Sequence, residues 1–155
     1  MRAALIEADL AFAEDEVPIG AVLVRDGAIV SAAHNQVEQL CDASAHAEML
    51  CLRRAAAAAP TWRLNATTLY CTVEPCPMCL AALHAFRVER LVYGAQNPRL
   101  GAVEGAMRPT HGAPHPYHDQ IAFTGGVLAT ETGELMRAFF RKQRQRPGYG
   151  RSNDD

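Results

Sequence analysis

The sequence predicts one α/β domain, and two patterns carry that prediction. Asp26-Gly27 stands between two apolar, strand-like runs, residues 19–25 and 28–34, which is a strong signal for a β-hairpin. Residues 67–94 read as strand, helix and strand, an order that needs a crossover and therefore pairs the two strands in parallel. A sheet with both kinds of pairing, joined through helices, is an α/β sheet.

The composition sets the class of protein. The chain has 155 residues, 49% of them hydrophobic and 21% charged, which is typical of one globular domain. We expect this domain to span residues 1–146 and a flexible tail to follow at 147–155. No apolar run approaches the roughly 20 residues of a membrane span, and the first residues lack a signal-peptide pattern, so we expect a soluble protein without a membrane partner.

The five cysteines indicate a reducing compartment, because their number is odd and their spacing does not resemble the disulfide framework of a small secreted domain. We expect Cys41, Cys51 and Cys71 to be buried free thiols, the usual state of cysteine in a protein interior. Cys76 and Cys79 stand apart from these three, because only two residues separate them.

The first 34 residues predict a helix and then the hairpin. Residues 2–14 place Leu5, Ala8 and Phe12 on one stripe of a helix. The run at 19–25 is apolar almost without interruption, which is typical of a central strand covered on both faces.

The segment after the hairpin predicts a polar strand end, a loop and a second helix. Asn35 lies where a strand ends, so its side chain can point into a crevice. A loop then leads to a helix over residues 45–59. Ser44 or Asp42 can cap this helix, which we expect to begin near His46.

The second half of the chain continues the alternation of strands and helices. Strands are expected at 67–72, 90–94 and 121–124, and helices at 77–86 and 130–146. Residues 95–119 form a long loop rich in Gly, Pro, Asn and His, and such loops usually have a function. Basic residues gather at the C-terminal end and suit either a phosphate backbone or a solvated helix face: Arg137, Arg141, Lys142, Arg144, Arg146 and Arg151.

Cys76-Pro77-Met78-Cys79 follows a predicted strand and opens a predicted helix. Pro77 suits the first helical turn, where a missing amide hydrogen does no harm. Both sulfurs then lie at the positive end of a helix dipole, which favours thiolate over thiol and so favours a bound cation.

His46-Ala47-Glu48 supplies a third ligand and an acid, and Glu48 lies 28 residues before Cys76. One histidine and two cysteines hold a tetrahedral zinc with its fourth position open for water, as in a catalytic site. Residues two apart on a helix cannot face one point beside it, so we expect the metal to lie beyond the helix N-terminus. His-x-Glu followed by Pro-Cys-x-x-Cys is the established signature of zinc-dependent nucleobase deaminases.

Two other interpretations of the cysteines remain open. Cys71 or Cys41 could close a structural zinc site as a fourth ligand, although a structural site has no use for a free Glu48 beside the metal. A redox pair would instead predict a disulfide between Cys76 and Cys79 and no metal.

The chain as a whole resembles the cytidine-deaminase superfamily and, within it, the tRNA adenosine-34 deaminases of bacteria and organelles, the TadA family. The resemblance rests on residues 16–24, Asn35, and residues 45–48, 69–79, 92–95 and 139–141. It implies a three-layer α/β/α fold on a five-stranded mixed sheet, a homodimer with one Zn²⁺ per subunit, and a location in the bacterial cytoplasm or the chloroplast stroma. Residues 115–118, His-Pro-Tyr-His, are similar to chloroplast members.

The resemblance also implies the reaction, which is hydrolysis of adenosine to inosine at the wobble position of a tRNA anticodon stem-loop. His46, Cys76 and Cys79 would hold zinc, which lowers the pKa of a water, and Glu48 would move the protons. The same fold also serves deaminases of free cytosine, guanine or their nucleosides, which is the alternative function.

Six residues are expected to bind the substrate. They are Asn35, Ala47, Asn97, His118, Phe140 and Arg144. Asn35 could instead be a turn residue, and Phe140 a core residue. Asn97 stands where many family members have aspartate, and it lies in the loop expected to meet RNA.

Overall fold

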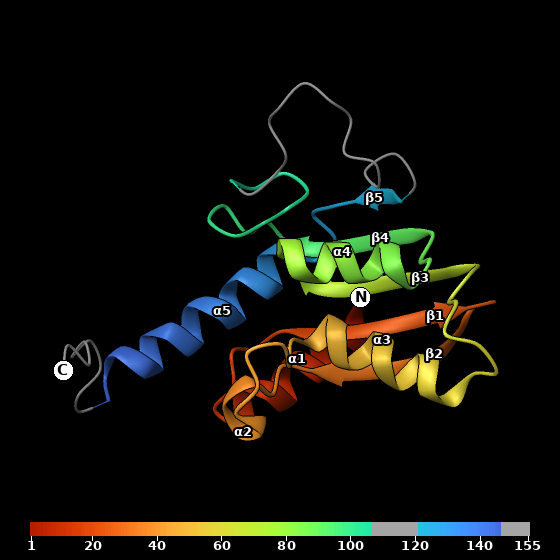
Figure 1. The fold of residues 1–155 in the computed structure, drawn as a ribbon. Helices are drawn as coiled ribbons and strands as arrows, with labels where there is room; N and C mark the ends of the chain where they lie inside the picture. The colour runs from red at the N-terminus through yellow and green to blue at the C-terminus, as the bar shows by residue number, and fades with distance from the viewer. Residues whose placement is uncertain (107–120, 147–155) are drawn as a thin grey trace.

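The computed structural model describes residues 1–106 and 121–146, and in it the predicted mixed sheet is present with five strands. The strand order is β2-β1-β3-β4-β5 (Figure 1). β1 runs antiparallel to both of its neighbours, whereas β3, β4 and β5 are parallel. The strands span Gly20–Arg25 (β1), Ala28–His34 (β2), Thr67–Val73 (β3), Arg90–Ala95 (β4) and Ala122–Thr124 (β5).

Helices cover both faces of the sheet and make three layers. They span Arg2–Ala13 (α1), Val37–Leu40 (α2), Ala47–Ala58 (α3), Pro77–Ala85 (α4) and Ala129–Arg144 (α5). In Figure 1, α3 and α4 lie in front of the sheet, and α1 lies behind it. The blue α5 packs against β3 and β4 and extends beyond the sheet. The expected α/β/α architecture is therefore confirmed.

The hairpin between β1 and β2 follows from its turn residues. Asp26 has a φ of 51° and Gly27 a φ of 76°, the left-handed pair that a two-residue hairpin turn requires. β1 lies between β2 and β3, and its first four residues are buried. The uninterrupted apolar run thus marks a strand covered on both faces, as predicted.

Helix α1 packs unusually close to β1. The side chains of Ala4, Ala8 and Ala11 are fully buried against the sheet. A Cβ atom added to Gly20 would overlap the Ala4 carbonyl oxygen and the Ala8 backbone nitrogen. Small residues on both partners therefore bring the end of α1, and the loop that follows it, close to the sheet.

Three details differ from the expectations. Cys41 is exposed, because it ends the short helix α2 in a left-handed conformation, whereas Cys51 and Cys71 are buried as predicted. Helix α2 lies in a segment predicted as a loop, since four residues are too few to show a helical period. Asp42 Oδ1 accepts hydrogen bonds from the backbone and hydroxyl of Ser44, so neither of these side chains caps α3.

Two of the expected segments concern residues that the structure does not describe. The tail at 147–155 and residues 107–120 of the long loop lie outside the described residues. Within residues 1–106 and 121–146, no helix has the length and apolar character needed to cross a membrane.

Candidate metal centre and cleft

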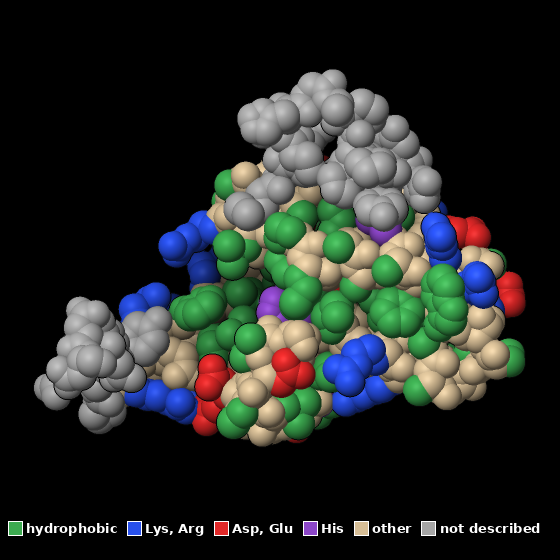
Figure 2. Space-filling view, in the orientation of Figure 1, with side chains coloured by type: hydrophobic (Ala, Val, Ile, Leu, Met, Phe, Trp, Pro, Cys, Tyr) green, Lys and Arg blue, Asp and Glu red, His purple; other side chains and the backbone are tan. Residues whose placement is uncertain are grey.

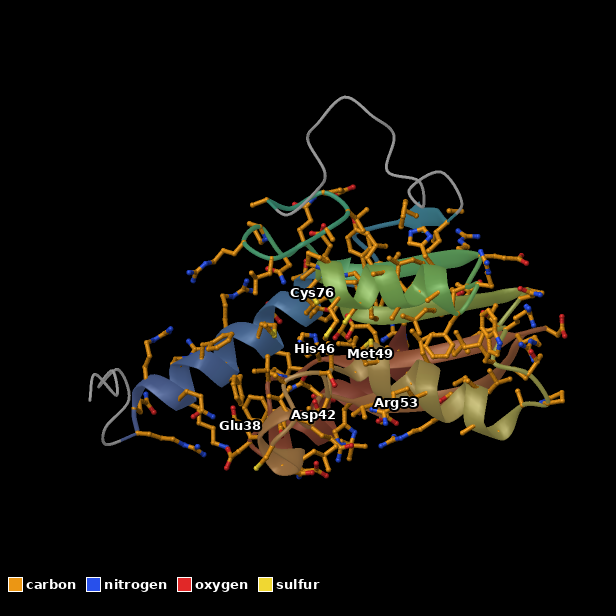
Figure 3. All side chains as sticks on the ribbon, viewed as in Figure 1. Glu38, Asp42, His46, Met49, Arg53 and Cys76 are labelled. Atoms are coloured by element: carbon orange, nitrogen blue, oxygen red, sulfur yellow. The ribbon has the colours of Figure 1, made fainter. Side chains whose placement is uncertain are left out.

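Two helix N-termini meet at the site. His46 is the residue before the first turn of α3, and Cys76 holds the same position before α4. Both have extended backbones, and Pro77 then opens α4 as expected. Figure 3 shows His46 and Cys76 close together between the starts of the two helices. Because His46 lies outside the helix, it can share a site with Glu48 although only one residue separates them.

The three predicted ligand atoms form a triangle that fits zinc. His46 Nδ1 lies 3.7 Å from Cys76 Sγ and 3.4 Å from Cys79 Sγ, and the two sulfurs are 3.7 Å apart. Tetrahedral zinc, with bonds of about 2.3 Å to sulfur and about 2.1 Å to nitrogen, separates two sulfurs by about 3.8 Å and sulfur from nitrogen by about 3.6 Å. The donor set therefore fits a zinc ion without rearrangement.

The charge on the two sulfurs also suits a cation. The contact with the Cys79 thiol, together with His46, lowers the pKa of Cys76 to about 4. The same contact, together with burial, raises the pKa of Cys79. The pair alone thus carries one negative charge, and a bound cation would stabilise both residues as thiolates.

Glu48 lies on the first turn of α3, beside the triangle but not part of it. Its side chain is 4% exposed, and within the described residues its Oε2 atom has no hydrogen-bond partner. Burial raises the pKa of Glu48. A buried carboxylate oxygen left without a partner is costly for folding, which is typical of a group kept for chemistry rather than stability.

The alternative ligands are not near the triangle. Cys71 Sγ donates to the Val73 carbonyl oxygen, and Cys41 is exposed at the end of α2. Among residues 1–106 and 121–146, the group that could hold a metal ion consists of His46, Cys76 and Cys79. A closed structural zinc site would need a fourth protein ligand, and neither candidate cysteine supplies it.

A cleft of about 1550 Å³ opens over the triangle and Glu48. It is lined by the loop after α1, by residues 94–100 and by one face of α5. Pockets for small ligands usually measure about 300–1,000 Å³, so this cleft has room for more than one nucleoside. In Figure 2, blue Lys and Arg side chains lie on both sides of α5 at the left of the molecule.

The structure describes five of the six predicted substrate residues, and three of these five line the cleft. Asn35, Asn97 and Phe140 line the cleft. The Ala47 side chain is fully buried in α3, and Arg144 is exposed on the last turn of α5, away from the lining. His118 lies outside the described residues. The roles of all six in substrate binding remain predictions.

Asn97 and Phe140 each have a partner within the protein. Asn97 Oδ1 accepts a hydrogen bond from the Leu100 backbone, and among the described residues the amide nitrogen of Asn97 has no partner. The Phe140 ring lies edge-on to Phe139, with the ring centroids 5.4 Å apart. Phe139 is buried and Phe140 is half-buried, so Phe140 combines a packing contact with a surface in the cleft.

Two salt bridges connect the end of α5 to the loop that follows α1. Asp15 Oδ1 accepts from Lys142 Nζ at 2.7 Å and from Arg146 at 2.6 Å. Hydrogen bonds from Lys142 and Arg146 lower the pKa of Asp15. Two members of the basic cluster, Lys142 and Arg146, therefore anchor the end of α5. Arg137 and Arg146 line the cleft. Arg137 lies three residues before Phe140 and therefore on the same face of a helix, so the sequence could have identified it as a residue of the cleft.

Glu74 is a second buried carboxylate beside the cleft that the sequence did not reveal. Its Oε1 accepts from the backbones of Val103, Glu104 and Gly105, and its Oε2 accepts from that of Asn97. Burial alone would raise the pKa of Glu74, but these four N–H donors outweigh it and hold the pKa below its usual range. Four backbone N–H groups of the loop at 97–105 thus donate to one carboxylate.

We predict that Glu74→Ala lowers the free energy of unfolding by at least about 3 kcal/mol, because four backbone N–H groups lose their acceptor. Glu74→Gln keeps one acceptor oxygen and should lose about half as much. Urea denaturation measures both changes, with the exposed Glu131→Gln as control. Equal stability of the Ala variant and the parent would show that the loop does not depend on this carboxylate.

Comparison with known protein families agrees with this geometry. Residues 1–95 match the family model described as the cytidine and deoxycytidylate deaminase zinc-binding region. A tRNA-specific adenosine deaminase of Agrobacterium fabrum is 45% identical over 149 residues, which cover 93% of each chain. The chloroplastic tRNA(adenine(34)) deaminase of Arabidopsis thaliana is 44% identical over 91% of this chain, which spans 12% of that longer protein. The two identities do not separate bacterial from organellar relatives.

Two solved structures that are similar to this chain are also deaminases. One from work on A-to-I editing by tRNA:A34 deaminases at the wobble position is 44% identical, with a TM-score of 0.77 over 87% of this chain and 96% of that chain. A guanine deaminase from Nitrosomonas europaea is 26% identical, with a TM-score of 0.74 over 88% of this chain and 80% of that chain. The zinc-site triangle, the fold and these similarities agree: the chain belongs to the cytidine and deoxycytidylate deaminase family, among the relatives named tRNA-specific adenosine deaminases.

Proposed function

We propose that this protein hydrolyses adenosine to inosine at the wobble position of a tRNA anticodon. The observation that carries the proposal is the triangle of His46, Cys76 and Cys79 beside the Glu48 carboxylate, whose Oε2 atom has no hydrogen-bond partner among the described residues. The relatives at 44–45% identity, which are named for tRNA adenosine deamination, support the choice of substrate.

Glu48 is the proton carrier in this proposal. When held by His46, Cys76 and Cys79, Zn²⁺ supplies a water activated for attack at neutral pH. Glu48 accepts the first proton that the water loses and delivers it to ring nitrogen N1. It then takes the second proton, from the new hydroxyl at C6, and gives it to the departing amino group. The products are inosine, which keeps the water oxygen at C6, and ammonia. A carboxylate whose pKa is raised by burial suits a group that both accepts and returns protons.

The cleft suits an RNA loop better than a free base. Its volume exceeds that of a small-molecule pocket, and Arg137 of α5 lines it. Phe140 offers a ring face for a flanking base, and Asn35 and Asn97 offer amide groups for the target nucleotide. An anticodon loop presents unpaired bases, so the target needs only to leave its stack.

The biological setting completes the proposal. The active form is a homodimer with one Zn²⁺ per subunit, located in the bacterial cytoplasm or the chloroplast stroma. Residues 1–146 are the deaminase domain.

A substrate panel tests this function. The zinc-loaded protein is incubated with an anticodon stem-loop that carries adenosine at the wobble position, and separately with free adenosine, guanine and cytosine. We predict inosine from the stem-loop, with a kcat/KM at least 100-fold above that for any free compound. Turnover of guanine or cytosine with an inert stem-loop would instead support the deaminase of free bases.

A further inference from the structure

Glu16 is a buried acid in the cleft that the proposed reaction does not use. It lies in the loop between α1 and β1, and its side chain is 1% exposed. Its Oε1 accepts the backbone N–H of Gln39 at 2.8 Å, and its Oε2 accepts from Asn35 Nδ2 at 3.0 Å. Both oxygens therefore accept hydrogen bonds, and the carboxylate joins α2 to the end of β2.

These two hydrogen bonds determine which end of the Asn35 side-chain amide faces Glu16. A side-chain amide can present either its oxygen or its nitrogen to a neighbour. The Gln39 backbone N–H can only donate, and a carboxylate with two accepting oxygens can bond only to the nitrogen end of Asn35. The backbone N–H of Asn35 is held as well, by the Ile19 carbonyl oxygen at 3.0 Å. Among the described residues, Oδ1 and one amide hydrogen of Asn35 have no partner, so they remain for a ligand in fixed positions.

We propose that Glu16 is a positioning residue, which fixes the orientation of the Asn35 amide so that it presents one acceptor and one donor to the target nucleoside. This inference rests on the proposed function for the identity of the substrate. It does not require Glu16 to touch the substrate.

A double-mutant cycle tests the inference with the anticodon stem-loop. In Glu16→Gln, the single amide oxygen cannot serve both Gln39 and Asn35, so the Asn35 amide loses its fixed orientation. We predict a KM about tenfold higher, with kcat within about threefold of the parent, because binding rather than chemistry is affected. In an Asn35→Ala background, the same Glu16→Gln change should alter KM less than twofold.

The cycle separates positioning from a general structural role. A purely structural Glu16 would cost the same in both backgrounds, and that result would overturn the inference. A parent-like KM in Glu16→Gln alone would overturn it as well. Glu131→Gln, at an exposed position of α5 away from the cleft lining, is the matched control and should leave KM unchanged.

If Glu16→Gln is unstable, a double variant that exchanges the carboxylate at position 16 with the amide at position 35 still tests the inference. In the double variant Glu16→Gln with Asn35→Asp, the new amide can accept from Gln39 and donate to the new carboxylate. We predict a melting temperature above that of Glu16→Gln alone, but a KM that stays raised, because a carboxylate presents no N–H to the substrate. Full recovery of KM in the exchanged pair would overturn the inference.

A measurement without substrate distinguishes this inference from the proposed function. The side-chain amide signals of Asn35 in proton–nitrogen NMR spectra should move in Glu16→Gln and stay unchanged in Glu131→Gln. If the parent forms no inosine but the signals depend on Glu16, the proposed function fails and the positioning role stands. If the signals do not respond to Glu16→Gln, the positioning role fails whatever the substrate.

Discussion

Replacing Glu48 by glutamine is expected to lower kcat for deamination by about 10²- to 10⁴-fold, the usual contribution of a positioned general acid/base. Glutamine has nearly the same shape, but its amide cannot accept the proton of the attacking water or return it to the leaving group. Zinc content should stay at one ion per chain, because Glu48 is not part of the ligand triangle. Inosine formation and metal analysis of the same preparation measure the two effects.

The stability of this variant provides an internal control. The Oε2 atom of Glu48 is buried without a partner among the described residues, so removing the charge should not destabilise the fold. We therefore expect a melting temperature equal to or above that of the parent. A Glu48→Gln protein with near-parental kcat would contradict the assignment of Glu48 as the proton carrier.

Loss of a ligand should abolish both metal binding and activity. We expect Cys76→Ser and His46→Ala to weaken zinc binding by at least about 100-fold, more than the 10- to 100-fold typical of residues that only support a ligand. Neither variant should form inosine above background. Metal analysis after dialysis against a chelator, followed by an assay with added zinc, measures both properties.

Cys41→Ser is the matched control for the ligand variants. Cys41 is exposed and lies outside the triangle, so this variant should keep one zinc ion and full activity. Loss of zinc from Cys41→Ser would favour a closed structural site. Full activity of the chelated parent without added zinc would contradict a metal-dependent reaction.

The strands, the large helices and the metal triangle could be predicted from the sequence because local patterns determine them. Asp26-Gly27 can adopt the left-handed turn of a hairpin wherever it stands, and the region around Pro77 shows the end of a strand and the start of a helix. His46, Cys76 and Cys79 could be named together because their chemistry is distinctive. Their common location, beyond two helix N-termini, also follows from the helical period.

Contacts between distant residues could not be predicted in this way. The hydrogen bonds that Glu16 accepts from Asn35 and that Glu74 accepts from residues 97–105 join segments that no periodicity relates. The exposure of Cys41 depends on a helix of four residues, and such a helix leaves no period in the sequence. These buried acids shape the cleft, so its details required the structure.

Oxygen labelling tests the central claim, hydrolytic deamination at a zinc site, most directly. The zinc-loaded protein is incubated with the adenosine stem-loop in water enriched in oxygen-18, and the nucleosides are analysed by mass spectrometry. We predict inosine that carries one solvent oxygen at C6 with the parent protein, and unchanged adenosine with Glu48→Gln. Unchanged adenosine with the parent, or inosine formed equally by both proteins, would contradict the proposed reaction and the role of Glu48.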